Sequence, residues 1–136
     1  MEIREFTMDD YDCVRQLWEV QGVRLEPGDS EEAIARKREC EPDLFLVAEN
    51  KGVILGVIIG SCDGRMGWIS RQAVHRTSRR MGIGSKLVEE VERRLKSKGV
   101  QQVALLVNRS DLEAQDFYQQ RGFEVEEEQL LMTKRL

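Results

Sequence analysis

Two hydrophobic periods alternate along this chain of 136 residues. In some segments apolar residues recur at every second position, which predicts half-buried strands, and in others they recur every three to four positions, which predicts amphipathic helices. The resulting order is strand, two helices, three strands, helix, strand, helix and strand. This interleaving predicts an α/β (α+β) fold with a mixed sheet flanked by helices, and it excludes a helical bundle or a β-sandwich. At this length, with 40% hydrophobic residues, a single domain over residues 1–136 is expected.

The predicted strands are short and end at turn residues. The sequence Asn50-Lys51-Gly52 separates two apolar runs and predicts a hairpin. The C-terminal tail also alternates, which predicts one or two terminal strands there. The predicted strands cover residues 2–6, 44–49, 53–61, 66–74, 101–107 and part or all of 123–136.

The predicted helices have recognisable first residues. Thr7 and Ser30 are N-cap residues for the first two helices, and Ser110 with Glu113 predicts a capping box for the last, which ends near Gly122. The third helix is long, opens at Gly82 and stops at Gly99. The apolar faces are expected at Tyr11, Val14, Leu17 and Trp18 in the first helix, and at Ile83, Leu87, Val88, Val91 and Leu95 in the third.

A basic stretch connects a predicted strand to the third helix. Residues 73–88 read AVHRTSRRMGIGSKLV and contain three arginines and one lysine without an acid, in a chain of net charge -4. A helix N-terminus presents unpaired N–H groups and a positive dipole end to an anion, and Gly82 and Gly84 allow a ligand to approach the backbone closely. A solvated basic loop is the simpler interpretation. The continuous order of strand, loop, glycines and helix favours a phosphate site.

Two common phosphate-binding patterns do not fit this stretch. Lys86 follows Ser85, which does not match G-x-x-x-x-G-K-[ST], and Arg79 stands where a dinucleotide fingerprint has its first glycine. The residues from Arg79 to Gly84 instead match R/Q-x-x-G-x-G/A. This hexapeptide resembles the acetyl-CoA pyrophosphate loop of the GNAT superfamily of N-acetyltransferases.

The resemblance covers nearly the whole chain and is closest to small single-domain bacterial and archaeal members. It implies a GNAT-like, mostly antiparallel sheet that splays open near residues 72–74. It further implies that pantetheine pairs with the backbone of Ala73 and Val74 and that backbone amides hold the pyrophosphate of acetyl-CoA. The implied pyrophosphate-binding residues are Arg79, Arg80, Met81, Gly82, Ile83, Gly84 and Ser85.

The segment DLEAQDFYQQRGF, residues 111–123, extends the resemblance. Tyr118 matches a tyrosine that commonly protonates the leaving thiolate in this family, a role suited to a phenol of pKa about 10 beside a thiol of pKa about 8.5. Helical spacing alone favours core packing for the same residue. The family often has Asn at Asp111, an expected pantetheine contact, and Pro at Arg76, which can instead add charge beside a phosphate.

The general base and the acceptor stay open at this stage. Leu106 stands where N-terminal-alanine acetyltransferases commonly have a glutamate, and His75 is expected to be a surface residue. Deprotonation of the amine is expected to go through water held by backbone groups or by Glu26, Asp29 or Asn108. The acceptor is expected to be chosen by residues 20–39 and by the terminal strands, whose acids either attract a cationic amine or simply keep the surface soluble.

The sequence therefore predicts an N-acetyltransferase that moves an acetyl group from acetyl-CoA directly to a primary amine in a ternary complex. The amine belongs to a small molecule, a peptide or a protein. A non-catalytic acyl-CoA-binding sensor or partner module is the alternative. The acidic balance and the lack of aromatics in the basic stretch argue against a nucleic-acid partner, and no apolar run is long enough for a membrane. No metal site is expected, three separated cysteines indicate reduced thiols and a cytoplasmic protein, and a homodimer through an edge strand is compatible with the fold.

Overall fold

A computed structural model describes all residues from 1 to 136. The chain divides into two compact units, Met1–Leu105 and Leu106–Leu136. The strands are β1 (Glu2–Glu5), β2 (Phe45–Asn50), β3 (Val53–Cys62), β4 (Gly67–Val74) and β5 (Val103–Leu105). The α-helices are α1 (Tyr11–Val20), α2 (Glu31–Cys40), α3 (Ile83–Ser97) and α4 (Leu112–Gln119), and the short 3-10 turns are η1 (Met8–Asp10), η2 (Pro27–Asp29), η3 (Pro42–Leu44) and η4 (Arg76–Ser78).

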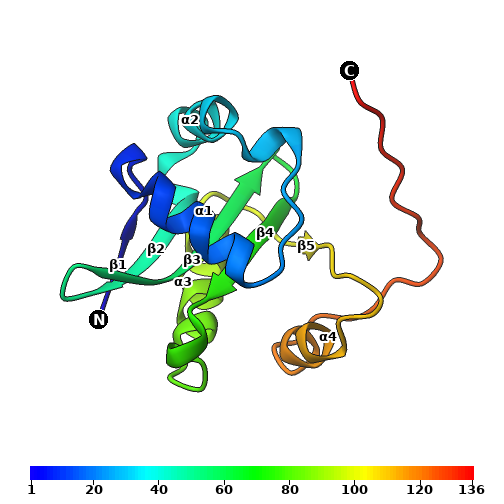
Figure 1. The fold of residues 1–136 in the computed structure, drawn as a ribbon. Coiled ribbons are helices and arrows are strands. Elements are labelled where there is room, and N and C mark those ends of the chain that lie inside the picture. The colour runs from blue at the N-terminus through cyan, green and yellow to red at the C-terminus, as the bar shows by residue number, and fades with distance from the viewer. The chain divides into compact units, whose positions relative to one another are not determined.

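The first unit contains one sheet of five strands in the order β1-β2-β3-β4-β5 (Figure 1). The pairs β1–β2, β2–β3 and β3–β4 are antiparallel, and β4–β5 is parallel. The predicted hairpin around Asn50-Lys51-Gly52 is β2–β3. These pairings confirm the mixed, mostly antiparallel sheet.

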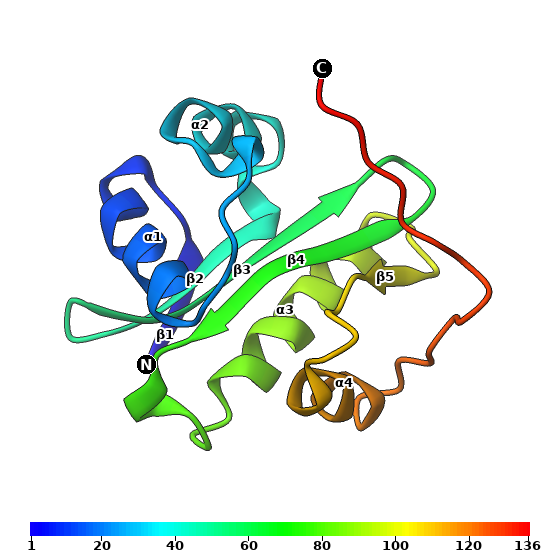
Figure 2. The same cartoon turned by 45° about the vertical axis from the view of Figure 1, so that its right-hand side comes forward.

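Helices cover both faces of this sheet, with α3 on one face and α1 and α2 on the other (Figure 2). Alternation along β3 explains the arrangement. Gly56 and Gly60 face α3, where an added Cβ would meet Leu87 and Val91, respectively. Val57 and Ile59, which alternate with these glycines along the strand, belong to the hydrophobic core that includes α1. β3 is therefore buried on both sides, which accounts for its nearly continuous apolar sequence.

The helix α3 follows its predicted pattern. All five residues of its expected apolar face are buried, and Gly82 and Gly99 flank the helix with left-handed φ values of +76° and +87°. A side chain at Gly67 would also lie only 2.7 Å from Cδ1 of Leu95, so β4 carries a glycine where α3 passes closest. The sheet therefore packs closely against α3 along the length of the helix.

The start of the second helix is confirmed, whereas the first α-helix starts at Tyr11 with Asp10, not Thr7, at its N-cap. Thr7 precedes the 3-10 turn η1, which leads directly into α1. Ser30 caps α2, because its side chain accepts a hydrogen bond from the Ala33 amide at 3.2 Å. The predicted apolar face of α1 is buried.

Three expectations for the chain from residue 101 onward are wrong. Asp111, not Ser110, caps α4, since its Oδ1 accepts from the Ala114 amide at 3.0 Å while Ser110 donates to the side chain of Asn108. The strand expected over residues 101–107 is only Val103–Leu105. The expected terminal strands over residues 123–136 are absent, because alternation makes a strand only where a ladder partner is present and this segment pairs with none.

Candidate active site

The parallel ladder between β4 and β5 is short. It joins Gly67, Trp68 and Ile69 to β5 and then stops, whereas β4 continues to Val74. Beyond Ile69, β4 is paired on its β3 side alone, and Ala73 and Val74 lie opposite Val57 and Gly56 of β3. The sheet therefore opens beside residues 70–74, as the resemblance implied for the region near residues 72–74.

A tight loop connects the end of β4 to α3. His75 caps the turn η4 through its Nδ1, which lies 3.3 Å from the Thr77 amide and 2.8 Å from the Thr77 hydroxyl. Arg80 and Gly82 then adopt left-handed φ values of +72° and +76°. Because His75 is exposed and bonded within its own turn, it has the local structural role expected of a surface residue.

The N-terminus of α3 is strongly positive. Gly82 provides no side-chain cap and the first turn of α3 contains no acid. A helix leaves the N–H groups of its first turn without intrahelical partners, so the dipole and the amides favour an anion here. The cationic side chains of this loop and first turn are exposed, and that of Arg79 also donates to Oε1 of Gln21. These side chains belong to Arg76, Arg79, Arg80 and Lys86.

The predicted cofactor residues of the first unit lie on consecutive elements. Ala73 and Val74 end β4, and residues 79–85 form the loop and the first turn of α3. Ile83 is buried, while Arg79 to Gly82 are exposed. One segment thus combines an open strand edge with a basic helix N-terminus.

Asp29 and Glu26, two residues named above for deprotonating the amine, each lie beside an arginine side chain. Both carboxylate oxygens of Asp29 accept from Arg71, at 2.8 Å and 2.6 Å, and Oδ2 also accepts from the Glu26 amide. Glu26 has an exposed side chain 3.6 Å from Arg24. Asp29 is therefore held in place by an ion pair with Arg71 and by the Glu26 amide.

The predicted residues of the second unit are Tyr118, on α4, and Asp111, the N-cap of that helix. Tyr118 packs edge-to-face against Phe117 and Phe123, with ring centroids 4.9 Å and 5.4 Å away. Burial raises the pKa of Tyr118 to about 12, with Arg121 acting to lower it and Asp111 to raise it. The phenol is therefore protonated at neutral pH. One carboxylate oxygen of Asp111 accepts the hydrogen bond that caps α4.

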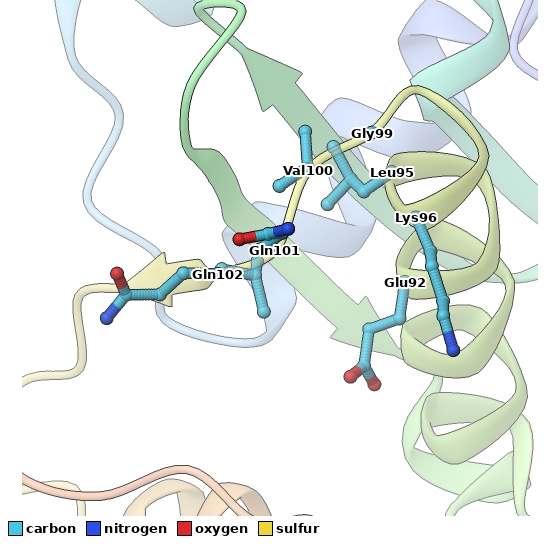
Figure 3. Close-up of a pocket in the computed structure, with 8 residues that line it drawn as sticks. Glu92, Leu95, Lys96, Gly99, Val100, Gln101 and Gln102 are labelled. Atoms are coloured by element: carbon cyan, nitrogen blue, oxygen red, sulfur yellow. The ribbon is translucent and has the colours of Figure 1, made fainter.

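A hollow of about 540 Å³ lies elsewhere in the first unit, between the C-terminal part of α3 and β5 (Figure 3). Its lining includes Glu92, Leu95 and Lys96 from the helix and Gln101 and Gln102 before the strand. At a rise of about 1.5 Å per residue, Glu92 lies roughly 15 Å along α3 from Gly82. None of the predicted site residues lines this hollow.

Other kinds of site have little support in the structure. No group of three His, Cys, Asp or Glu side chains is placed to hold a metal ion, and Cys13, Cys40 and Cys62 are all free thiols. No helix has the length and apolar character needed to cross a membrane.

One contact near the site was not predicted from the sequence. Arg71, on β4, forms the ion pair with Asp29 although 42 residues separate them. Neither the hydrophobic periodicity of the sequence nor a known motif indicates such a long-range ion pair. Only the strand register and the path of residues 21–30 bring the two side chains together.

Comparisons with known proteins agree with this geometry. The family model described as the acetyltransferase (GNAT) family matches residues 5–123. An acetyltransferase of Sodalis glossinidius is 36% identical over 136 residues, covering 100% of this chain and 96% of that protein. An acetyltransferase of Photorhabdus laumondii is 42% identical over 108 residues, covering 79% and 75%.

Solved structures show the same fold. The structure of Ard1 from Thermoplasma volcanium has a TM-score of 0.84 and 27% identity, covering 92% of this chain and 83% of that chain. The PaiA N-acetyltransferase of Thermoplasma acidophilum, solved in complex with coenzyme A, has a TM-score of 0.79 at 24% identity, covering 92% and 90%. The family model and the full-length relatives establish that this chain belongs to the GNAT family of acetyltransferases.

Proposed function

We propose that this acetyltransferase uses acetyl-CoA as the acetyl donor and a primary amine as the acceptor, with residues 1–136 acting as one catalytic domain. The family match over residues 5–123 spans both compact units and supports treating them as one functional domain. Acyl-CoA use by the family and the coenzyme A complex of the Thermoplasma acidophilum relative support the choice of donor.

The observation that carries the proposal is the basic N-terminus of α3 beside the open edge of β4. The pyrophosphate of acetyl-CoA carries negative charge, which the acid-free first turn and its dipole stabilise. Gly82 fits close approach of a phosphate, because an added Cβ there would meet no protein atom within 4 Å and so points into open space. Arg76, Arg80 and Lys86 are exposed cations that can contact the phosphate groups.

The pantetheine arm is assigned to the edge of β4 at Ala73 and Val74. This edge has no β5 partner beyond Ile69, so its backbone groups can pair with the amides of an extended arm. The same assignment places the acetyl group near the middle of β4. Asp111 is proposed as a further cofactor contact through the carboxylate oxygen that does not cap α4.

The proposed chemistry is a single transfer. The neutral amine attacks the thioester carbonyl, the carbon–sulfur bond breaks, and Tyr118 donates its phenolic proton to the leaving sulfur before regaining one from solvent. Its pKa of about 12 keeps the proton in place at physiological pH. We assign no covalent acetyl-enzyme, because a thiol nucleophile needs an activating base and His75, the single histidine of the chain, is bonded within its own turn. The proton of the amine leaves through water or Glu26.

The cellular compartment and the acceptor are also proposals. Three unpaired cysteines suit the reducing cytoplasm, where we place the activity. The acceptor belongs to the class of primary amines, on small molecules or on peptides and proteins.

A turnover assay tests the proposal. Purified protein is incubated with acetyl-CoA and each of three probes, and release of the free thiol is followed over time. The probes are a short peptide with a free α-amino group, an N-acetylated peptide with one lysine, and spermidine. Amine-dependent thiol release supports the enzyme. Tight acetyl-CoA binding without release for any probe supports an acyl-CoA-binding module instead.

A further inference from the structure

Arg71 and Asp29 form a bidentate ion pair beside the proposed acetyl site. Nε of Arg71 donates to Oδ1 of Asp29 at 2.8 Å, and Nη2 donates to Oδ2 at 2.6 Å. The Asp29 side chain is only 6% exposed and that of Arg71 is 27% exposed. Such fork-shaped pairs fix direction as well as distance, because two parallel hydrogen bonds allow one relative orientation.

The backbone of Arg71 is strained at the same point. Ser70 lies opposite Ile59 and Ala73 opposite Val57, so Arg71 and Gln72 together face the single residue Ile58 in a β-bulge. Arg71 has a φ of +54°, a strained value for a non-glycine residue that persists only where the surroundings hold it. Nε1 of Trp18, on α1, donates to the Arg71 carbonyl at 3.0 Å and supplies part of that support.

Asp29, the other partner in the ion pair, holds residues 21–30 in place through further hydrogen bonds. Oδ2 of Asp29 accepts from the Glu26 amide at 2.8 Å, and the Asp29 carbonyl accepts from the buried hydroxyl of Tyr11 at 2.8 Å. Nη2 of Arg71 also reaches the Arg24 carbonyl at 3.5 Å. Arg71 therefore ties the connection between α1 and α2 to the bulge in β4 through three hydrogen bonds.

We propose that Arg71 and Asp29 are positioning residues for acetyl transfer, which hold residues 21–30 against the bulge so that the amine lies at the acetyl group. The inference rests on the proposed function, in which Ala73 and Val74 carry the pantetheine arm. Ala73 is two residues beyond Arg71, about 7 Å along an extended strand. Loss of the ion pair therefore moves residues 21–30, on the acceptor side, relative to the acetyl group, while Ala73 and Val74 still hold the donor.

The chain contains a matched control for this pair. Arg4 of β1 donates to both oxygens of Asp10, at 2.8 Å and 2.9 Å, and Asp10 also accepts from the Thr7 amide at the start of η1, as Asp29 does from Glu26 in η2. The exposed fractions are similar, 29% for Arg4 and 9% for Asp10. Arg4 also donates to Glu49, and it lies on the edge strand β1, away from the bulge in β4.

The experiment compares Arg71→Lys and Asp29→Asn with Arg4→Lys in the turnover assay with the three amine probes. Lysine keeps the charge but loses the fork, and asparagine keeps the shape but loses the charge. We expect kcat/KM for the amine to fall about 10- to 100-fold in Arg71→Lys and Asp29→Asn, since displacements near 1 Å can cost about 100-fold. Acetyl-CoA affinity should stay within about twofold, and Arg4→Lys should keep the wild-type kcat and amine KM.

Hydrogen exchange of the Trp18 indole gives a readout that does not need turnover. Faster exchange is expected in Arg71→Lys and unchanged exchange in Arg4→Lys. Wild-type kinetics in a folded Arg71→Lys, or an equal loss in Arg4→Lys, would overturn the positioning role while leaving the proposed function intact. A wild type that acetylates none of the three amines would overturn the proposed function, and the positioning role with it.

Discussion

A Cβ placed on Gly56 of β3 would lie 3.1 Å from Cγ2 of Ile83, the first residue of α3. The same atom would lie 3.0 Å from Cδ1 of Leu87 and 3.3 Å from the Ala73 carbonyl. One glycine thus sets the distance between the central sheet, the proposed pantetheine strand and the helix N-terminus. The proposed phosphate site at the N-terminus of α3 therefore depends on the close packing of this helix against Gly56.

Gly56→Ala should therefore weaken both folding and donor binding. We expect the free energy of unfolding to fall by about 1–3 kcal/mol, because the added methyl displaces packed groups. Acetyl-CoA affinity should fall as well, since the first turn of α3 moves. Denaturant unfolding and calorimetric titration measure the two effects. Gly28→Ala is the control, since its Cβ meets nothing within 4 Å, and its stability should be unchanged or slightly higher.

Tyr118→Phe removes the proposed acid but keeps the ring that packs against Phe117 and Phe123. General acid catalysis typically contributes about 10²- to 10⁴-fold, so kcat should fall by that order while acetyl-CoA affinity and the unfolding midpoint stay close to wild type. Steady-state kinetics and titration on the same preparation separate the effects. Unchanged kcat in the folded variant would assign Tyr118 to packing alone.

The pH profile of wild-type turnover provides a separate test of the phenol. Below its pKa the acceptor amine is protonated and cannot attack, so activity with an α-amino peptide should rise up to about pH 8, the pKa range of that group. Because burial raises the pKa of Tyr118 to about 12, the phenol keeps its proton and activity should hold constant to about pH 10. A decline between pH 8 and pH 10, in protein still folded, would contradict Tyr118 as the acid.

Acid should destabilise the fold through Glu90. Hydrogen bonds from Arg93 and then Arg94 lower the pKa of Glu90 to about 2 from an ordinary value of 4.5. A lowered folded-state pKa adds stability that is present above the unfolded value and lost as pH falls through the folded one. With its side chain 23% exposed, Glu90 should contribute about 1–2 kcal/mol after solvent screening.

Urea unfolding at pH 6 and at pH 3 measures this contribution. The free energy of unfolding should fall less in Glu90→Gln than in wild type over that interval. Asp43, whose pKa is lowered mainly by Lys98, stays in both proteins and contributes the same residual slope. Identical slopes in wild type and Glu90→Gln would show that the Arg93 and Arg94 contacts do not stabilise the fold.

The parts of the fold that the sequence predicts correctly are those governed by local periodicity. Ile83, Leu87 and Val91 recur at helical spacing, and all are buried against the sheet. Ser30 stands before acids that favour a helix start, and it caps α2. These features need no knowledge of distant residues.

The errors come from choices that local pattern cannot make. Ser110 and Asp111 are both good caps, and the structure selects Asp111 because Ser110 bonds to Asn108. Alternation in residues 123–136 does not supply a ladder partner, so no strand forms there. The ion pair between Arg71 and Asp29 is likewise not indicated by local pattern, because only the register of β4 brings Arg71 to both oxygens of Asp29.

Calorimetric titration of acetyl-CoA into wild type, Gly82→Glu and Gly64→Glu tests the central claim most directly. Both glycines have left-handed φ values, +76° and +91°, with open space at Cβ, so the two variants share backbone strain and added charge. Only Gly82 lies at the N-terminus of α3. We predict tight binding to wild type and Gly64→Glu and none to folded Gly82→Glu. Equal binding by all three, or no binding by folded wild type, would contradict the assignment of this helix N-terminus as the acetyl-CoA site.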